Sequence, residues 1–158
     1  DGGMNNIKRE LEKLFAYCDE KITVKDIDRI VTKMPQSRVF EMIDAMLKKD
    51  AATVFSRLDE LKTLKESAFM VLALLYTNFE RIFHAKILLE HAAPYGSIAA
   101  QIKVSPYFVR DYVNAAQSFD KDFLKKALMS IAEIDYNIKQ GRIGEWIGVE
   151  NFLANCLI

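Results

Sequence analysis

Apolar side chains recur along this chain mainly at steps of three and four residues, which is the spacing of one face of an α-helix. Near the N-terminus the repeat predicts a helix from about residue 4 to 20, and its members are Ile7, Leu11, Leu14, Phe15 and Cys18. The same reasoning predicts helices at about 23–33, 37–49, 51–64, 67–91, 97–102, 105–118, 120–140 and 144–157. No segment shows sustained alternation of apolar and polar residues, so we expect an all-α protein.

Residues that favour helix ends mark several of these boundaries. Asp50 and Asp120 stand where a side-chain oxygen can accept from the amides of a first helical turn. Ser105 is predicted to do the same, with Pro106 at the first helical position. Gly141 is placed to end the long helix before it, because glycine adopts the left-handed conformation that follows many helices.

The sequence Met34-Pro35-Gln36 interrupts the helical pattern, because proline disfavours helical conformation in the residue before it. We therefore expect a two-helix remnant, residues 1–34, followed by a helical bundle, residues 37–158, whose first helix Ser37 would cap. The helix at 67–91 is apolar nearly all the way round in its first half, which is typical of a helix at the centre of a bundle.

The charge balance argues against a general nucleic-acid-binding protein. Lysine plus arginine and aspartate plus glutamate number 22 each, so the chain has no overall positive field to attract a phosphate backbone. The longest apolar run, Ala68 to Tyr76, is far shorter than the ~20 residues that cross a bilayer, so no membrane span is expected. The two cysteines, Cys18 and Cys156, both fall on apolar stripes, which favours buried free thiols in a reducing, cytoplasmic compartment.

Candidate chemistry is sparse. No glycine-rich loop opens a helix in the pattern that grips nucleotide phosphates. His84 and His91 lie on one predicted helix without a third metal ligand at a matching turn, and neither cysteine has a histidine nearby in sequence. A thiol nucleophile stays open but has no support. We expect no catalytic residue, no cofactor and no metal, so the chain is predicted not to be an enzyme.

The strongest local pattern is the segment from Ile98 to Val109, which has the short helix, tight turn and second helix of a helix-turn-helix. Lys103 occupies the turn position that glycine commonly holds. The second helix brings one arginine, one asparagine and one glutamine, together with Asp111, which is little for reading base edges. Two interpretations stay open: a DNA-binding regulator, or a helical corner used for packing.

The order of segments resembles the C-terminal part of the delta subunit of the bacterial DNA polymerase III clamp loader. The matching text is IKRELEKLFAYC at 7–18, ITVKDIDRI at 22–30, VFEMIDAMLK at 39–48, Phe79-Glu80-Arg81, IAAQIKVSPYFVRDYV at 98–113 and EIDYNIKQG at 133–141. The likeness covers nearly the whole chain in order, although each motif by itself is diffuse.

The resemblance implies that residues 1–34 are the end of an AAA+ lid domain and that residues 37–158 are a collar domain. In that family, collars pack side by side to hold a five-subunit ring with the ATPase gamma/tau and delta-prime subunits. The resemblance also implies that the sliding clamp is gripped by an N-terminal domain outside this chain, that primer-template DNA is met through the whole complex, and that delta does not hydrolyse ATP.

Aromatic and arginine side chains dominate the energetics of protein interfaces, so they are the candidates for interface or DNA contacts. The candidates are Phe79, Arg81, Tyr107, Phe108, Arg110, Tyr136 and Trp146. Tyr107, Phe108 and Arg110 form a cluster that could meet the end of primer-template DNA by stacking and charge. The last helix is expected to bury Trp146 and Ile147.

Overall fold

The computed structural model describes residues 2–17, 22–23 and 35–157 of the chain. These residues form eight α-helices and no strand, which confirms the all-α prediction. The chain divides into two compact units, residues 1–34 and 35–158. The predicted helix at 23–33 and the thiol of Cys18 lie outside the described residues.

The first unit contains α1 (Gly2–Tyr17). Its predicted apolar stripe is present, but the side chains along it differ in exposure. Leu14 is buried, whereas Ile7, Leu11 and Phe15 are exposed. The helix therefore has the amphipathic sequence of a packed element with most of its apolar face open.

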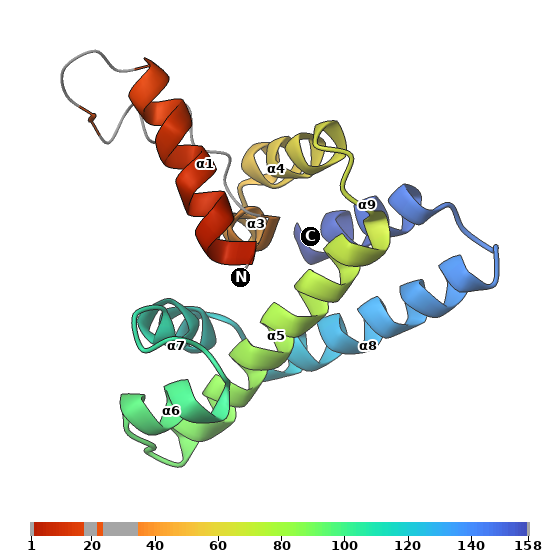
Figure 1. Ribbon diagram of the computed structural model, residues 1–158. Coiled ribbons are helices and arrows are strands. Elements are labelled where there is room, and N and C mark those ends of the chain that lie inside the picture. Colours follow the sequence, from red (N-terminus) through yellow and green to blue (C-terminus); the bar gives the residue numbers. More distant parts are fainter. Residues whose placement is uncertain (1, 18–21, 24–34, 158) are drawn as a thin grey trace. The chain divides into compact units, whose positions relative to one another are not determined.

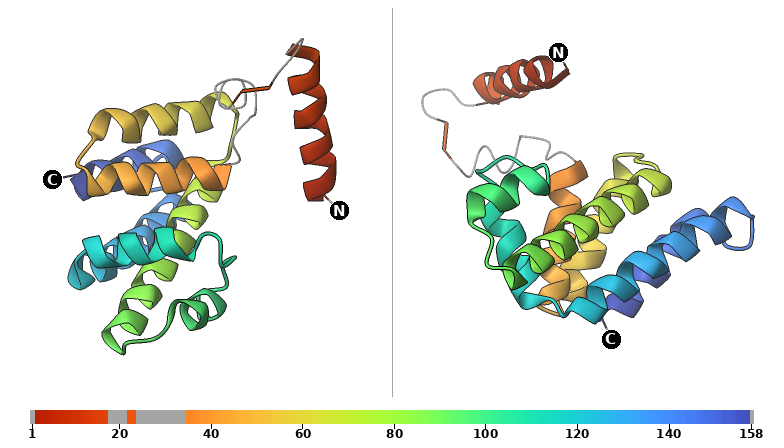
Figure 2. Two further views of the ribbon diagram at one scale, coloured as in Figure 1. Left: turned by 90° about the vertical axis from the view of Figure 1, so that its left-hand side faces the viewer. Right: turned by 90° about the horizontal axis from the view of Figure 1, so that it is seen from below.

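The second unit is a bundle of seven helices (Figures 1 and 2). They are α3 (Pro35–Leu47), α4 (Ala51–Thr63), α5 (Ala68–Glu90), α6 (Tyr95–Gln101), α7 (Val109–Ser118), α8 (Lys121–Lys139) and α9 (Glu145–Leu157). α5 contacts α3, α7, α8 and α9, so it is the central helix, as its apolar circumference predicts. α3 packs on α4, and α8 packs on α9.

The structure corrects several predicted boundaries, and two of them have a clear cause in the backbone. α3 begins at Pro35, two residues before the expected cap at Ser37, because the fixed φ of proline suits the first turn, where its missing amide costs nothing. α7 begins at Val109, because residues 106–108 form turns instead of a helical first turn. Two caps are confirmed: Asp50 accepts from Thr53 N, and Asp120 accepts from Asp122 N and Phe123 N.

Five helices end in the same way, with a residue in the left-handed region that follows the last turn. The amide of the next residue donates to the carbonyl five residues back, at 2.9–3.1 Å, which is the Schellman arrangement. Four of the five left-handed residues are not glycine: Lys49, Lys65, Ala92 and Lys103, with φ of 54–58°, beside Gly141 with φ of 69°. Each such residue carries a conformational cost that glycine avoids.

The aromatic core lies around Phe79 on the central helix. Its ring meets those of Phe119, Phe123 and Phe152 edge to face, at centroid distances of 5.9, 6.3 and 5.9 Å. Phe79 is fully buried. This cluster ties α5 to α8 and α9, and it is the largest group of aromatic side chains in the bundle's interior.

Close packing between α8 and α9 depends on a glycine. A Cβ atom added at Gly148 would lie 2.9 Å from both Ile134 Cγ2 and Ile138 Cδ1, closer than real Cβ atoms approach such neighbours. No side chain fits at this position without displacing the isoleucines. Gly148 therefore sets how near the two helices come.

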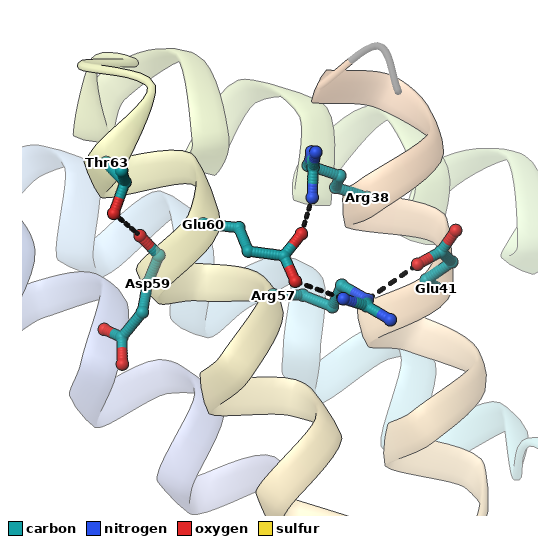
Figure 3. Close-up of polar contacts among 6 residues, drawn as sticks. All are labelled: Arg38, Glu41, Arg57, Asp59, Glu60 and Thr63. Carbon is teal, nitrogen blue, oxygen red and sulfur yellow. Dashed lines mark hydrogen bonds and ion pairs between the residues drawn. The ribbon is translucent and has the colours of Figure 1, made fainter. Parts of the chain in front are cut away.

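α3 and α4 are joined by charged side chains as well as by apolar packing (Figure 3). Glu60 on α4 pairs with Arg38 on α3 and with Arg57 on its own helix. Arg57 Nε in turn lies 2.7 Å from Glu41 Oε2 on α3. Because these groups are partly buried, the network orients the two helices more than it adds net stability.

Candidate interaction surfaces

The turn between α6 and α7 directs two aromatic rings outward. After the left-handed residue Lys103, the amide of Phe108 donates to the carbonyl of Ser105 at 2.9 Å, which closes a turn ahead of α7. Val109 then points into the core, so the residues just before it face outward. The local backbone thus explains why the second helix of the pattern begins later than its proline predicts.

Tyr107 and Phe108 form what we call the aromatic corner. Tyr107 is 84% exposed and Phe108 is 52% exposed, and their rings meet edge to face with centroids 5.1 Å apart. Arg110 is exposed immediately beyond them. An open aromatic pair beside a guanidinium can stack on planar groups and attract anions.

Two interactions that the sequence analysis missed anchor the helix behind this corner. Lys86 Nζ on α5 donates to the carbonyls of Ala116 and Phe119, at 2.9 and 2.7 Å, and so binds the C-terminal end of α7. The hydroxyl of Tyr112 donates to Asn78 Oδ1 at 2.7 Å in the buried interface between α7 and α5. Neither pair has a sequence signal, because 30 and 34 residues separate the partners.

A second group of candidates lies at the turn between α8 and α9, at the far end of the bundle from the aromatic corner (Figure 1). Tyr136 is 53% exposed, and the guanidinium of Arg142 lies 5.5 Å from its ring centre. Trp146 is half-buried under Lys62 Nζ, 5.4 Å from the ring centre. Ile147, expected to be buried, is exposed.

The remaining two candidates differ from both groups. Arg81 is half-buried on α5. Phe79 has no exposed surface and its ring is enclosed by three other phenylalanines, so it belongs to the core. This corrects its prediction as a contact residue: aromatic identity suits an interface and a core equally well, and only packing separates the two.

The described residues contain no group of three or more side chains suited to hold a metal ion. Cys156 is a buried free thiol, as predicted. Burial raises the pKa of the Cys156 thiol to about 12, with a small opposing effect of Lys49, so the thiolate is scarce at neutral pH. No helix among the described residues is both long and apolar enough to cross a membrane.

The arrangement of the helices and the comparisons with known proteins define one class of protein. Residues 36–156 match the model of the family described as DNA polymerase III delta subunit, C-terminal domain. The match extends over most of the chain, and the chain belongs to this family.

A protein and a solved structure from Bacillus subtilis are similar to the chain over nearly its whole length. The chain is 24% identical over 159 aligned residues to the DNA polymerase III subunit delta of strain 168, covering 99% of this chain and 46% of that protein. It is similar in fold to the solved structure of the Bacillus subtilis DNA clamp loader delta protein, with a TM-score of 0.86 and 24% identity, over 99% of this chain and 47% of that one. The chain thus spans about half the length of both relatives.

Proposed function

We propose that this chain is a non-catalytic scaffold of a bacterial clamp loader, and that residues 37–158 are the collar through which it assembles with the gamma/tau and delta-prime subunits in the cytoplasm. Residues 1–34 would be the end of the lid domain. The observation that carries the proposal is the family match over residues 36–156.

The surface of the second unit suits this role. Exposed or half-exposed aromatic and arginine side chains lie at both ends of the bundle, at the aromatic corner and around Tyr136 and Trp146. Such side chains supply large contact areas at low entropic cost, which is why they dominate protein interfaces. The surface around Tyr136 and Trp146 is therefore the candidate contact with a neighbouring subunit, and the aromatic corner stays open to another partner.

The direct test is to mix the chain with the gamma/tau and delta-prime subunits of the same clamp loader and to measure the mass of the product by light scattering after size exclusion. We expect a mixed assembly larger than any component. The control is a full-length delta subunit with the same partners, which shows that the partners are competent. If full-length delta assembles and this chain does not, the collar proposal is wrong for this chain.

We propose further that the aromatic corner contacts primer-template DNA in the assembled loader. Tyr107 presents most of its ring to solvent, and Arg110 supplies a positive charge beside it. Stacking of one base on an aromatic ring is worth about 1–3 kcal/mol, or roughly 5- to 150-fold in affinity.

The test is Tyr107→Ala in a loader reconstituted with a full-length delta subunit, with the affinity for fluorescent primer-template DNA as the readout. We expect a loss of at least 5-fold. Tyr76→Ala is the matched control, because Tyr76 is also an exposed tyrosine but lies on α5, outside both groups of candidates. An unchanged affinity for Tyr107→Ala, or an equal loss for both variants, would exclude a stacking role.

A DNA-binding regulator has less support than the scaffold. Because α7 begins at Val109, its exposed first turn offers Arg110 and Asp111, whose charges cancel. Sequence-specific binding of duplex DNA by the isolated chain, with a steep dependence on salt, would favour the regulator instead.

A further inference from the structure

A groove of about 580 Å³ lies between α3, the start of α4, and α7. Its walls come from segments more than 50 residues apart in the sequence, so no sequence pattern marks it. Ile43, Ala45 and Ala115 form a buried apolar floor, and the half-buried Phe40 and Leu47 extend it. The volume is sufficient for one or two large side chains of another molecule.

The rim of the groove is acidic. Four carboxylates line it, against two cationic side chains: Glu41, Asp44, Asp50 and Asp111 against Lys48 and Arg57. Both cations are engaged already. Lys48 Nζ lies 2.5 Å from Asp44 Oδ2, and Arg57 pairs with Glu41 and Glu60.

One carboxylate differs from the others. Asp50 holds the start of α4 through Thr53, whereas the carboxylate of Asp111 has no hydrogen bond or ion pair within the described part of the chain. Asp111 is exposed in the first turn of α7, on the opposite wall from Asp44. The groove therefore has an apolar floor, an unengaged carboxylate and a surplus of negative charge.

These features select the chemistry of an occupant. A phosphate or a nucleic acid would be repelled by the rim, and a purely apolar side chain would leave the carboxylates desolvated and unpaired. The side chain of arginine or lysine fits both parts, because its aliphatic stem packs on apolar surface while its charged head reaches carboxylates. Arginine fits best, since its guanidinium can bind one carboxylate through two hydrogen bonds.

We propose that this groove is a docking site for a basic segment of a neighbouring subunit, which inserts an arginine or lysine with its stem on Phe40 and Leu47 and its head at Asp111. The inference rests on the proposed assembly with gamma/tau and delta-prime. It adds to that assembly a specific polar contact at the groove between α3, α4 and α7.

The test compares two charge reversals on the binding of the chain to gamma/tau and delta-prime. Asp111→Lys removes the unengaged carboxylate, and Asp122→Lys is its matched control, because Asp122 is likewise an exposed acid in the first turn of a helix but lies outside the groove. Asn114→Trp is a second variant, which fills the groove from an exposed position without changing charge. Circular dichroism and thermal unfolding verify that each variant is folded.

We expect Asp111→Lys and Asn114→Trp each to raise the dissociation constant for the partner subunits at least 10-fold. Asp122→Lys should change this constant less than 2-fold. Higher salt should reduce the difference in affinity between the Asp111→Lys variant and the unmodified chain, because salt screens the charges. Unchanged binding of Asp111→Lys, or equal losses for both charge reversals, would overturn the docking site and leave the assembly proposal standing. If the unmodified chain does not assemble while full-length delta does, the assembly proposal itself fails, and the docking site with it.

Discussion

Phe79 and Tyr107 are both aromatic, yet they lie in opposite surroundings. Phe79 has no exposed surface and sits among three other phenylalanines, whereas Tyr107 is 84% exposed with one aromatic neighbour. The difference arises from position in the fold: Phe79 is on the inward side of the central helix, and Tyr107 is in a turn that precedes a helix. Aromatic residues in this protein therefore either pack in the core or are exposed at the surface, depending on where the backbone places them.

The largest difference between the two aromatic residues is expected for Phe79→Ala and Tyr107→Ala. Phe79→Ala should lower the free energy of unfolding by about 3–5 kcal/mol, because it leaves a cavity between α5, α8 and α9. Tyr107→Ala, in contrast, should change it by less than about 0.5 kcal/mol. Urea denaturation followed by circular dichroism measures both. Similar losses for the two variants would show that the aromatic corner is packed in solution.

A smaller loss in the free energy of unfolding should follow from Gly148→Ala, which tests the packing of α9 against α8. The added methyl would press on Ile134 and Ile138, and overpacking of this kind costs about 1–3 kcal/mol. Gly96→Ala is the matched control near the α6–α7 region, where an added Cβ meets nothing within 4 Å. Denaturation midpoints compare the pair. Because alanine favours a helix more than glycine does, Gly96→Ala should not lower the midpoint. An unchanged midpoint for Gly148→Ala would show that the two isoleucines move aside at no cost.

Tyr112→Phe tests the buried hydrogen bond between α7 and α5, behind the aromatic corner. Removing the hydroxyl leaves Asn78 Oδ1 buried without its donor, which should cost about 1–2 kcal/mol. Tyr136→Phe, whose hydroxyl is on an exposed ring, should cost nothing measurable. Thermal unfolding by calorimetry distinguishes them. An equally small effect of both would show that water replaces the lost donor at Asn78.

The smallest expected effect is a gain in stability. Lys103→Gly relieves a lysine held at φ of 55° in the turn before the aromatic corner, and should raise the free energy of unfolding by about 0.5–1 kcal/mol. Gly141→Ala makes the opposite change at the equivalent turn after α8, because it puts a side chain on a residue with φ of 69°. It should lower the free energy of unfolding by a similar amount. Chemical denaturation of both variants provides the check. A loss on Lys103→Gly would show that the lysine side chain contributes more than its backbone costs.

The starts of the helices were easier to predict from the sequence than the left-handed turns at their ends. Asp50 and Asp120 were predictable as caps, because a single side chain and the two or three amides after it make the interaction. The left-handed turns at Lys49, Lys65 and Ala92 were not predictable in the same way, since none of them carries the glycine that usually marks such a position.

Three features of the chain follow from the sequence by itself: the all-helical class, the central place of the helix at 68–90, and the family, whose diffuse motifs recur in order over most of the length. These depend on periodicity and on segment order, both of which are local or linear properties of the chain. Only the tertiary structure separated the buried Phe79 from the exposed Tyr107, joined Lys86 to the end of α7, and brought Asp111 to the same groove as Asp44. Such relations depend on how helices distant in sequence pack against one another, and helical periodicity records which face of a helix is apolar but not which neighbour covers it.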